Sequence, residues 1–98
     1  MATVTRMAQE FVKFDGRKIT HASVELRYPM GDGNEYRLHG NVICRQYEKN
    51  GPLHFDWCDW YTPTTANHMN EILKAAGKDK RVSYAQARDA GVEAFTVY

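Results

Sequence analysis

The chain of 98 residues contains little cysteine and no long apolar run. No stretch approaches the roughly 18 consecutive apolar residues that a membrane-spanning helix needs. The first residues, MATVTRMAQEF, also lack the basic segment followed by an apolar segment that marks a secretory signal. The two cysteines of such a chain are most simply free thiols in a reducing compartment. We therefore expect a cytoplasmic protein that has no membrane partner.

A strong imbalance of charge is also missing. The chain has 13 Lys and Arg against 12 Asp and Glu, which gives a net charge of +1. A DNA mimic would be strongly acidic, and a non-specific nucleic-acid binder is usually strongly basic, so the composition favours neither, although a local basic face remains possible. Hydrophobic residues make up 43% of the chain, enough for a core, and we expect residues 1–98 to form one domain.

The usual spacings of metal ligands and catalytic residues are absent as well. The four His and two Cys form no CxxC or HxxxH pattern, and no Gly-rich phosphate loop follows a predicted strand. In the predicted sheet, His39 and His54 lie about 26 Å apart, so these two and His21 cannot share one metal ion. His54, Asp56 and Cys58 share a strand face, but their side chains point in parallel about 6.5–7 Å apart. We expect no catalytic, metal or cofactor site.

The first half of the chain predicts strands after one short helix. Residues 3–14 carry apolar side chains at helical spacing, although a strand remains an alternative for this segment. Residues 18–28 and 35–47 alternate between apolar and polar side chains, which indicates two half-buried strands. Asn50-Gly51 is a strong hairpin signal, and the alternation resumes in residues 53–61.

The apolar faces of the last two strands predict their register. If both faces lie on the same side of the sheet, the numbers of paired residues sum to an odd value such as 101. Cys44 would then pair with Trp57, and Tyr47 with His54. A slip of one residue would bring Cys44 opposite Cys58 but would turn the core face outward, so the pattern argues against a disulfide between these strands.

The second half predicts two helices and a final strand. A helix should run from Thr62, a good N-cap before a proline, to a stop at Gly77. Ser83 and Gln86 form a capping box for a second, short helix, and residues 92–98 alternate as a strand. The predicted fold is α+β: a three-stranded antiparallel meander packed against helices, with a C-terminal strand returning to a sheet edge that the sequence does not identify.

The outward face of this sheet is the predicted binding surface. Exposed Trp, Tyr and Arg are enriched at protein-binding hot spots, and the same side chains can stack single-stranded bases. Acidic residues on and beside the face dilute its positive charge and favour a protein partner. A third possibility is that the last strand, the N-terminal segment or a dimer mate covers Trp60. The predicted partner-binding residues are Arg27, Arg37, Arg45, Tyr47, His54, Asp56 and Trp60.

The residues from Tyr61 to Leu73, YTPTTANHMNEIL, follow the predicted hairpin and contain the spacing T-T-x-x-H-x-N-x-x-L. This arrangement resembles a family of small bacteriophage-encoded proteins of unknown function, in which a hairpin with an Asn-Gly or Asp-Gly turn leads into the same motif. The resemblance covers about residues 36–73, and Gly40–Cys44 with Trp60-Tyr61 are similar to the hairpin. It implies no activity. It does imply a phage accessory protein acting on host machinery, anti-CRISPR-like in size and class. Within the motif, we expect His68 to be a structural histidine.

Together these observations predict a non-enzymatic phage protein that inhibits a host defence protein, such as a CRISPR effector complex, in the host cytoplasm. The alternative is a small single-stranded nucleic-acid-binding module that uses the same face. A purely structural or dimerising domain is a third reading, and the sequence leaves open whether the protein is a monomer or a homodimer.

Overall fold

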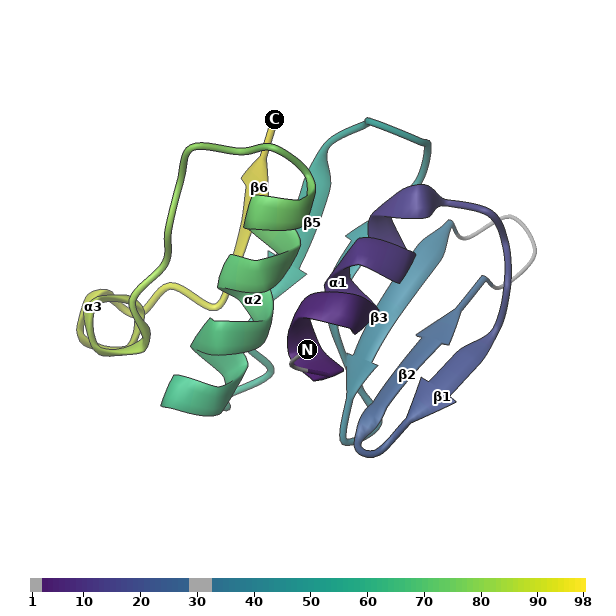
Figure 1. Ribbon diagram of the computed structural model, residues 1–98. Coiled ribbons are helices and arrows are strands. Elements are labelled where there is room, and N and C mark those ends of the chain that lie inside the picture. The colour runs from purple at the N-terminus through teal and green to yellow at the C-terminus, as the bar shows by residue number, and fades with distance from the viewer. Residues whose placement is uncertain (1–2, 29–32) are drawn as a thin grey trace.

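The computed structural model describes residues 3–28 and 33–98. Residues 29–34 have a composition that predicts a turn, and most of them lie outside the described residues. Six strands form one antiparallel sheet in which each strand pairs with the next along the chain (Figure 1). The elements are α1 (Thr3–Lys13), β1 (Ile19–His21), β2 (Val24–Arg27), β3 (Asn34–Leu38), β4 (Asn41–Gln46), β5 (Leu53–Asp56), α2 (Pro63–Ala75), α3 (Tyr84–Ala90) and β6 (Ala94–Val97).

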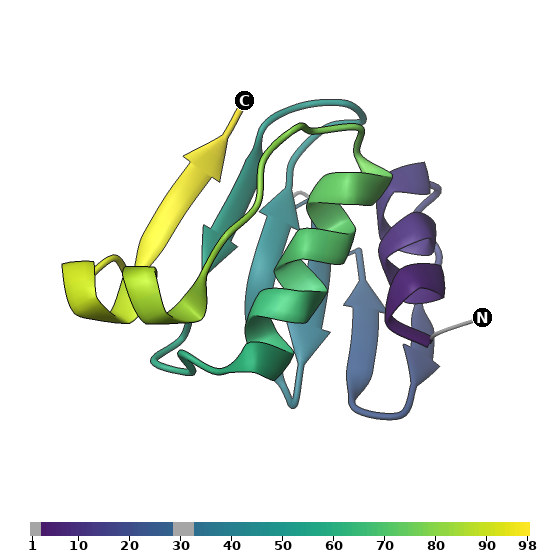
Figure 2. The same cartoon turned by 60° about the vertical axis from the view of Figure 1, so that its left-hand side comes forward.

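The helices lie on one side of the sheet. Helices α1 and α2 pack side by side on the same face, and α3 lies towards β6 (Figures 1 and 2). We call this side the covered face and the opposite side the open face. The α+β class, the helical N-terminal segment and the C-terminal strand at a sheet edge were predicted correctly, but the meander has more strands than the three expected. No helix of the described residues is long and apolar enough to cross a membrane.

The core lies between the covered face and the two helices. Apolar side chains from β2 to β6 meet one face of α1 and one face of α2, as burial of an amphipathic stripe requires. Trp57, just after β5, is fully buried in the same core. The fully or nearly fully buried members are Met7, Ala8, Phe11, Val24, Leu26, Tyr36, Leu38, Ile43, Cys44, Leu53, Phe55, Trp57, Ala66, Met69, Ile72, Leu73 and Val97.

The extra strands arise because two predicted strands are tight hairpins. Residues 18–28 turn back at Ala22 and Ser23, and residues 35–47 turn back at His39 and Gly40. Three of these four turn residues have positive φ values: 54° at Ala22, 51° at His39 and 83° at Gly40. Gly40 fits such a turn well, and His tolerates positive φ better than most residues, but Ala22 is not typical of it. The residue types at these positions therefore did not clearly predict the two hairpins.

A β-bulge explains why only some residues of β4 face the side of the sheet that was predicted for them. Because the chain turns at His39-Gly40, the first residues of β4 that face the core are displaced by one position from the predicted ones. The extra residue of the bulge, Ile43, restores the predicted positions from Cys44 onwards. Cys44 therefore faces the core as predicted, whereas Ile43, which regular alternation with Cys44 would place on the opposite face, is also buried. The bulge accommodates two consecutive buried residues, which a regular strand cannot place on one face.

The register between β4 and β5 differs from the prediction by two residues. Cys44 pairs with Phe55 and Arg45 with His54, so the paired numbers sum to 99 instead of 101. The odd sum keeps the predicted faces, and Phe55 and Trp57 are buried as expected. Cys44 and Cys58 are both free thiols in the structure.

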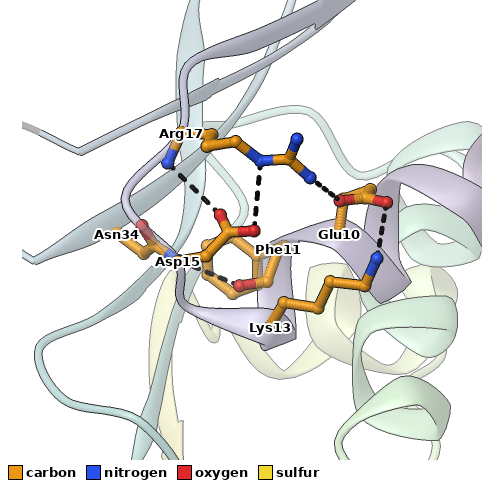
Figure 3. A network of polar contacts seen from close by, with 6 residues as sticks. All are labelled: Glu10, Phe11, Lys13, Asp15, Arg17 and Asn34. Atoms are coloured by element: carbon orange, nitrogen blue, oxygen red, sulfur yellow. Dashed lines mark hydrogen bonds and ion pairs between the residues drawn. The ribbon is translucent and has the colours of Figure 1, made fainter.

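Local capping interactions hold the helices in place. The Thr62 hydroxyl accepts a hydrogen bond from the Thr65 amide at the start of α2, and Gly77 follows its end with a φ of 73°. Ser83 caps α3 as predicted. At the end of α1, the Asn34 amide donates a 2.9 Å hydrogen bond to the Phe11 carbonyl oxygen and ties the helix to β3 (Figure 3).

Candidate functional site

The open face carries a band of polar and charged side chains across β2 to β6. Alternate residues of each strand point to this side, away from α1 and α2, because successive side chains in a strand point to opposite faces. Within the described residues, no helix covers it (Figures 1 and 2). The strand register places on the open face Glu25, Arg27, Glu35, Arg37, Val42, Arg45, His54, Asp56, Ala94 and Thr96.

Glu35 is the centre of this band. Its side chain is only 4% exposed, although it lies on the face without helices. Arg37 Nη2 lies 2.9 Å from one carboxylate oxygen of Glu35, and Arg45 Nη2 lies 2.5 Å from the other. Arg27 forms a separate ion pair of 2.9 Å with Glu25. The three predicted arginines are therefore brought together, and each is paired with a carboxylate of the same chain.

The other half of the band consists of Tyr47, His54 and their neighbours. The rings of Tyr47 and His54 meet edge to face with centroids 5.3 Å apart, and His54 Nδ1 shares a 3.1 Å hydrogen bond with Thr96 Oγ1. Tyr47 is 55% exposed. Together with Arg45 and Asp56, these two residues line a depression of about 270 Å³ on the open face. Six of the seven predicted binding residues thus belong to one continuous surface.

Trp60 is the exception, and its predicted place on the sheet face was wrong. Strand β5 ends at Asp56, and Cys58 and Asp59 then adopt positive φ values of 53° and 62°. This turn leads the chain to the start of α2 and carries Trp60 away from the band. The Trp60 side chain is 57% exposed, so neither the last strand nor the N-terminal helix covers it. It lines a separate cavity of about 230 Å³, together with Leu38, His39, Asn41, Ile43, Thr62, Thr64 and Thr65.

The thiols near the band have little nucleophilic character. Burial and the neighbouring carboxylate of Asp56 raise the pKa of Cys58 to about 11, and burial raises the pKa of Cys44 well above its usual value. A thiol is a nucleophile in its deprotonated form, so both side chains are protonated and weakly reactive near neutral pH. Among the residues that the structure describes, no cluster of three or more His, Cys, Asp or Glu could hold a metal ion.

The residues of the T-T-x-x-H-x-N-x-x-L motif mostly make contacts within the protein. His68 is buried, its Nδ1 lies 2.7 Å from the Tyr36 hydroxyl, and burial lowers the pKa of its imidazole. The Asn70 amide forms two hydrogen bonds with the backbone of Val82, of 2.7 and 3.1 Å, and so positions the segment before α3. Leu73 lies in the core. The motif therefore describes how α2 is fixed to the rest of the fold, and His68 is the structural histidine that was predicted.

No protein-family model matches the chain, and no curated protein or solved structure matches it either. Glu35, the central residue of the open face, was missed by the sequence reasoning. The sequence does contain a pattern that could have indicated its role. Glu25 and Glu35 each precede an arginine by two residues, Arg27 and Arg37, so each pair lies on one strand face.

Proposed function

We propose that the protein is a non-enzymatic binding domain that contacts another protein through the open face. The observation that carries the proposal is a sheet surface that no helix of the described residues covers, on which paired arginines surround Glu35 beside the exposed Tyr47 ring. Arg and Tyr are among the residues that contribute most at protein interfaces. The ion pairs also hold the arginine side chains in defined positions, which reduces the entropy lost when a partner binds.

The charge balance of the open face favours a protein over a nucleic acid. Arg27, Arg37 and Arg45 supply three positive charges, and Glu25, Glu35 and Asp56 supply three negative charges. Binding of phosphates requires unpaired Lys or Arg that release counterions from the nucleic acid. Here an approaching phosphate would have to compete with the carboxylates that already pair with the arginines. A protein surface with its own charges of both signs is a better complement.

The partner class that we propose is a host defence protein, such as a CRISPR effector complex. Support for this class comes from the resemblance of residues 36–73 to small bacteriophage-encoded proteins. In that setting the protein would act by occupying a surface of its target. The weakly reactive thiols of Cys44 and Cys58 are in keeping with such a role.

The test is capture of partners from a CRISPR-bearing bacterial lysate, with and without nuclease, by the tagged wild-type protein and by matched variants. We expect the wild type and Arg88→Glu to retain the same protein after nuclease treatment, and Tyr47→Ala and Arg45→Glu to lose it. Arg88 is the control because it is exposed and lies in α3, on the opposite side of the sheet from the open face (Figure 2). Trp60→Ala tests whether the separate cavity takes part.

Three outcomes would contradict the proposal. Retention that disappears with nuclease, and a steep fall of affinity with salt, would indicate the nucleic-acid alternative. Retention of the same protein by both open-face variants would exclude the open face as the binding surface. A lysate in which only Trp60→Ala loses the partner would move the interface to the cavity beside α2.

A further inference from the structure

Helix α3 borders a groove at the opposite end of the molecule from β1. None of its residues is fully buried, so the helix does not close down on the sheet (Figure 2). The groove between α3, the segment before it and β6 has a volume of about 340 Å³. Its walls include the apolar side chains of Val82, Ala87, Val92 and Phe95, which are half-buried or exposed. Small-molecule pockets typically have volumes of about 300–1,000 Å³ and apolar walls.

One wall of the groove contains a buried donor without an acceptor. Trp57 is fully buried and stacks on Tyr61 with ring centroids 5.5 Å apart. Its indole Nε1–H finds no hydrogen-bond partner among the described residues, whereas the neighbouring Tyr61 hydroxyl donates to the Val92 carbonyl oxygen at 2.9 Å. A buried unpaired N–H is unfavourable and uncommon in folded proteins. Trp57 has no exposed surface, so a ligand oxygen would reach this N–H and supply the missing acceptor only as α3, which has no buried residue, moves away from it.

The charges at the groove have one sign. Lys80 and Arg81 are the two charged residues that line it, and both are exposed. Within residues 3–28 and 33–98, neither forms an ion pair with a carboxylate, in contrast to the arginines of the open face. Arginine and lysine that are not neutralised by the protein favour an anionic ligand.

We propose that this groove binds a small amphipathic carboxylate, the size of a medium-chain fatty acid. The apolar body would pack against Val92 and Phe95. A carboxylate oxygen would accept a hydrogen bond from Trp57 Nε1–H, and Lys80 and Arg81 would supply the complementary charge. The site is separate from the open face, so it does not depend on the proposed function.

The first test follows the two indole N–H signals of ¹⁵N-labelled protein by NMR while octanoate is added. Trp60→Phe identifies which signal belongs to Trp57. We expect the Trp57 signal to move downfield and to saturate with octanoate, because its N–H gains an acceptor. Octanol has the same chain without the charge and should bind more weakly. A Trp57 signal that does not respond to octanoate would overturn the proposal, and equal affinity for octanol would overturn the assignment of an anionic ligand.

The second test reverses one charge at the groove and one elsewhere. Arg81→Glu should weaken octanoate binding about twofold to fivefold, since an exposed charge pair contributes up to roughly a factor of five. Lys49→Glu makes the same change in net charge at the turn between β4 and β5, and it should leave octanoate binding unchanged. Octanol binding should be the same in both variants. Equal octanoate affinities for Arg81→Glu and Lys49→Glu would contradict the proposed role of Arg81.

Discussion

The two faces of the sheet are built from the same strands but depend on different interactions. On β3, Tyr36 is buried against α1 and α2, while its neighbours Glu35 and Arg37 form ion pairs on the other side. On β5, Phe55 lies in the core, while His54 contacts Tyr47 and Thr96 on the open face. Apolar burial of one face can stabilise the fold, which leaves the composition of the other face free to serve recognition.

The largest expected effect compares two aromatic truncations, one on the covered face and one at the open face. Phe55→Ala removes a ring that is 2% exposed and stacks on Phe95 at 5.0 Å, so unfolding should require about 3–5 kcal/mol less free energy. Tyr47→Ala removes an exposed ring and should cost about 0.5–1 kcal/mol. Urea unfolding of the two variants measures both values. Similar losses would show that the open face contributes to stability as much as the core does.

A second prediction concerns the buried carboxylate of the open face. Glu35→Gln would leave Arg37 and Arg45 without a negative partner, and we expect a loss of about 1–2 kcal/mol in unfolding free energy, which is less than for a fully buried pair because both arginines are partly exposed. Asp89→Asn breaks the exposed ion pair between Arg88 and Asp89 and serves as the control, with a change within about 0.5 kcal/mol. If the two variants lose equal stability in urea, Glu35 is not a structural centre of the face.

The third prediction is a pH dependence that comes from the covered face. Burial, and then the nearby charge of His39, lower the pKa of His68 below its ordinary 6.5. The unfolded chain therefore binds the proton more readily than the folded protein does, so stability is highest above pH 6.5 and decreases as the pH falls below it. The lowered pKa values of Glu10 and Asp15 act in a more acidic range, below their ordinary 4.5 and 3.8.

Urea midpoints between about pH 7.5 and 5 would measure this effect. We expect the decline to shrink in His68→Gln, which cannot be protonated and can still approach Tyr36. His21→Gln replaces an exposed histidine of β1 and should keep the decline of the wild type. An unchanged decline in His68→Gln would mean that another group on either face causes it.

Much of the architecture could be predicted because local signals and global packing agree. Thr62, Gly77 and Ser83 mark helix ends through their own chemistry, and the structure places all three at those ends. The alternation in β5 gave the correct faces although the partner residues were off by two. Periodicity reports which side a residue faces, and it does not fix the exact partner when the connecting turn can vary in length.

The missing strands and the position of Trp60 have a common cause in backbone conformation. The chain is redirected where Ala22, His39, Cys58 and Asp59 adopt positive φ values. Positive φ is uncommon outside glycine, even for the more tolerant His and Asp, so these residue types did not indicate a turn. The central role of Glu35 depends on β2, β3 and β4 being adjacent, which includes hairpins that were not predicted. Residue types thus predicted that the sheet has a binding surface. Which residues belong to that surface depended on turns that tertiary contacts stabilise.

The sequential order of the strands has a consequence for how the protein should fold and open. Strands β1 to β5 are joined by short connections, but residues 57–93 separate β5 from β6, and Thr5 in α1 bonds Glu71 in α2 across most of the chain. Pairings between near neighbours lose less chain entropy than distant ones when they form. The central hairpin of β3 and β4 should therefore form early and hold its amide hydrogens longest, while β6 opens more readily and exchanges its amides before the central strands.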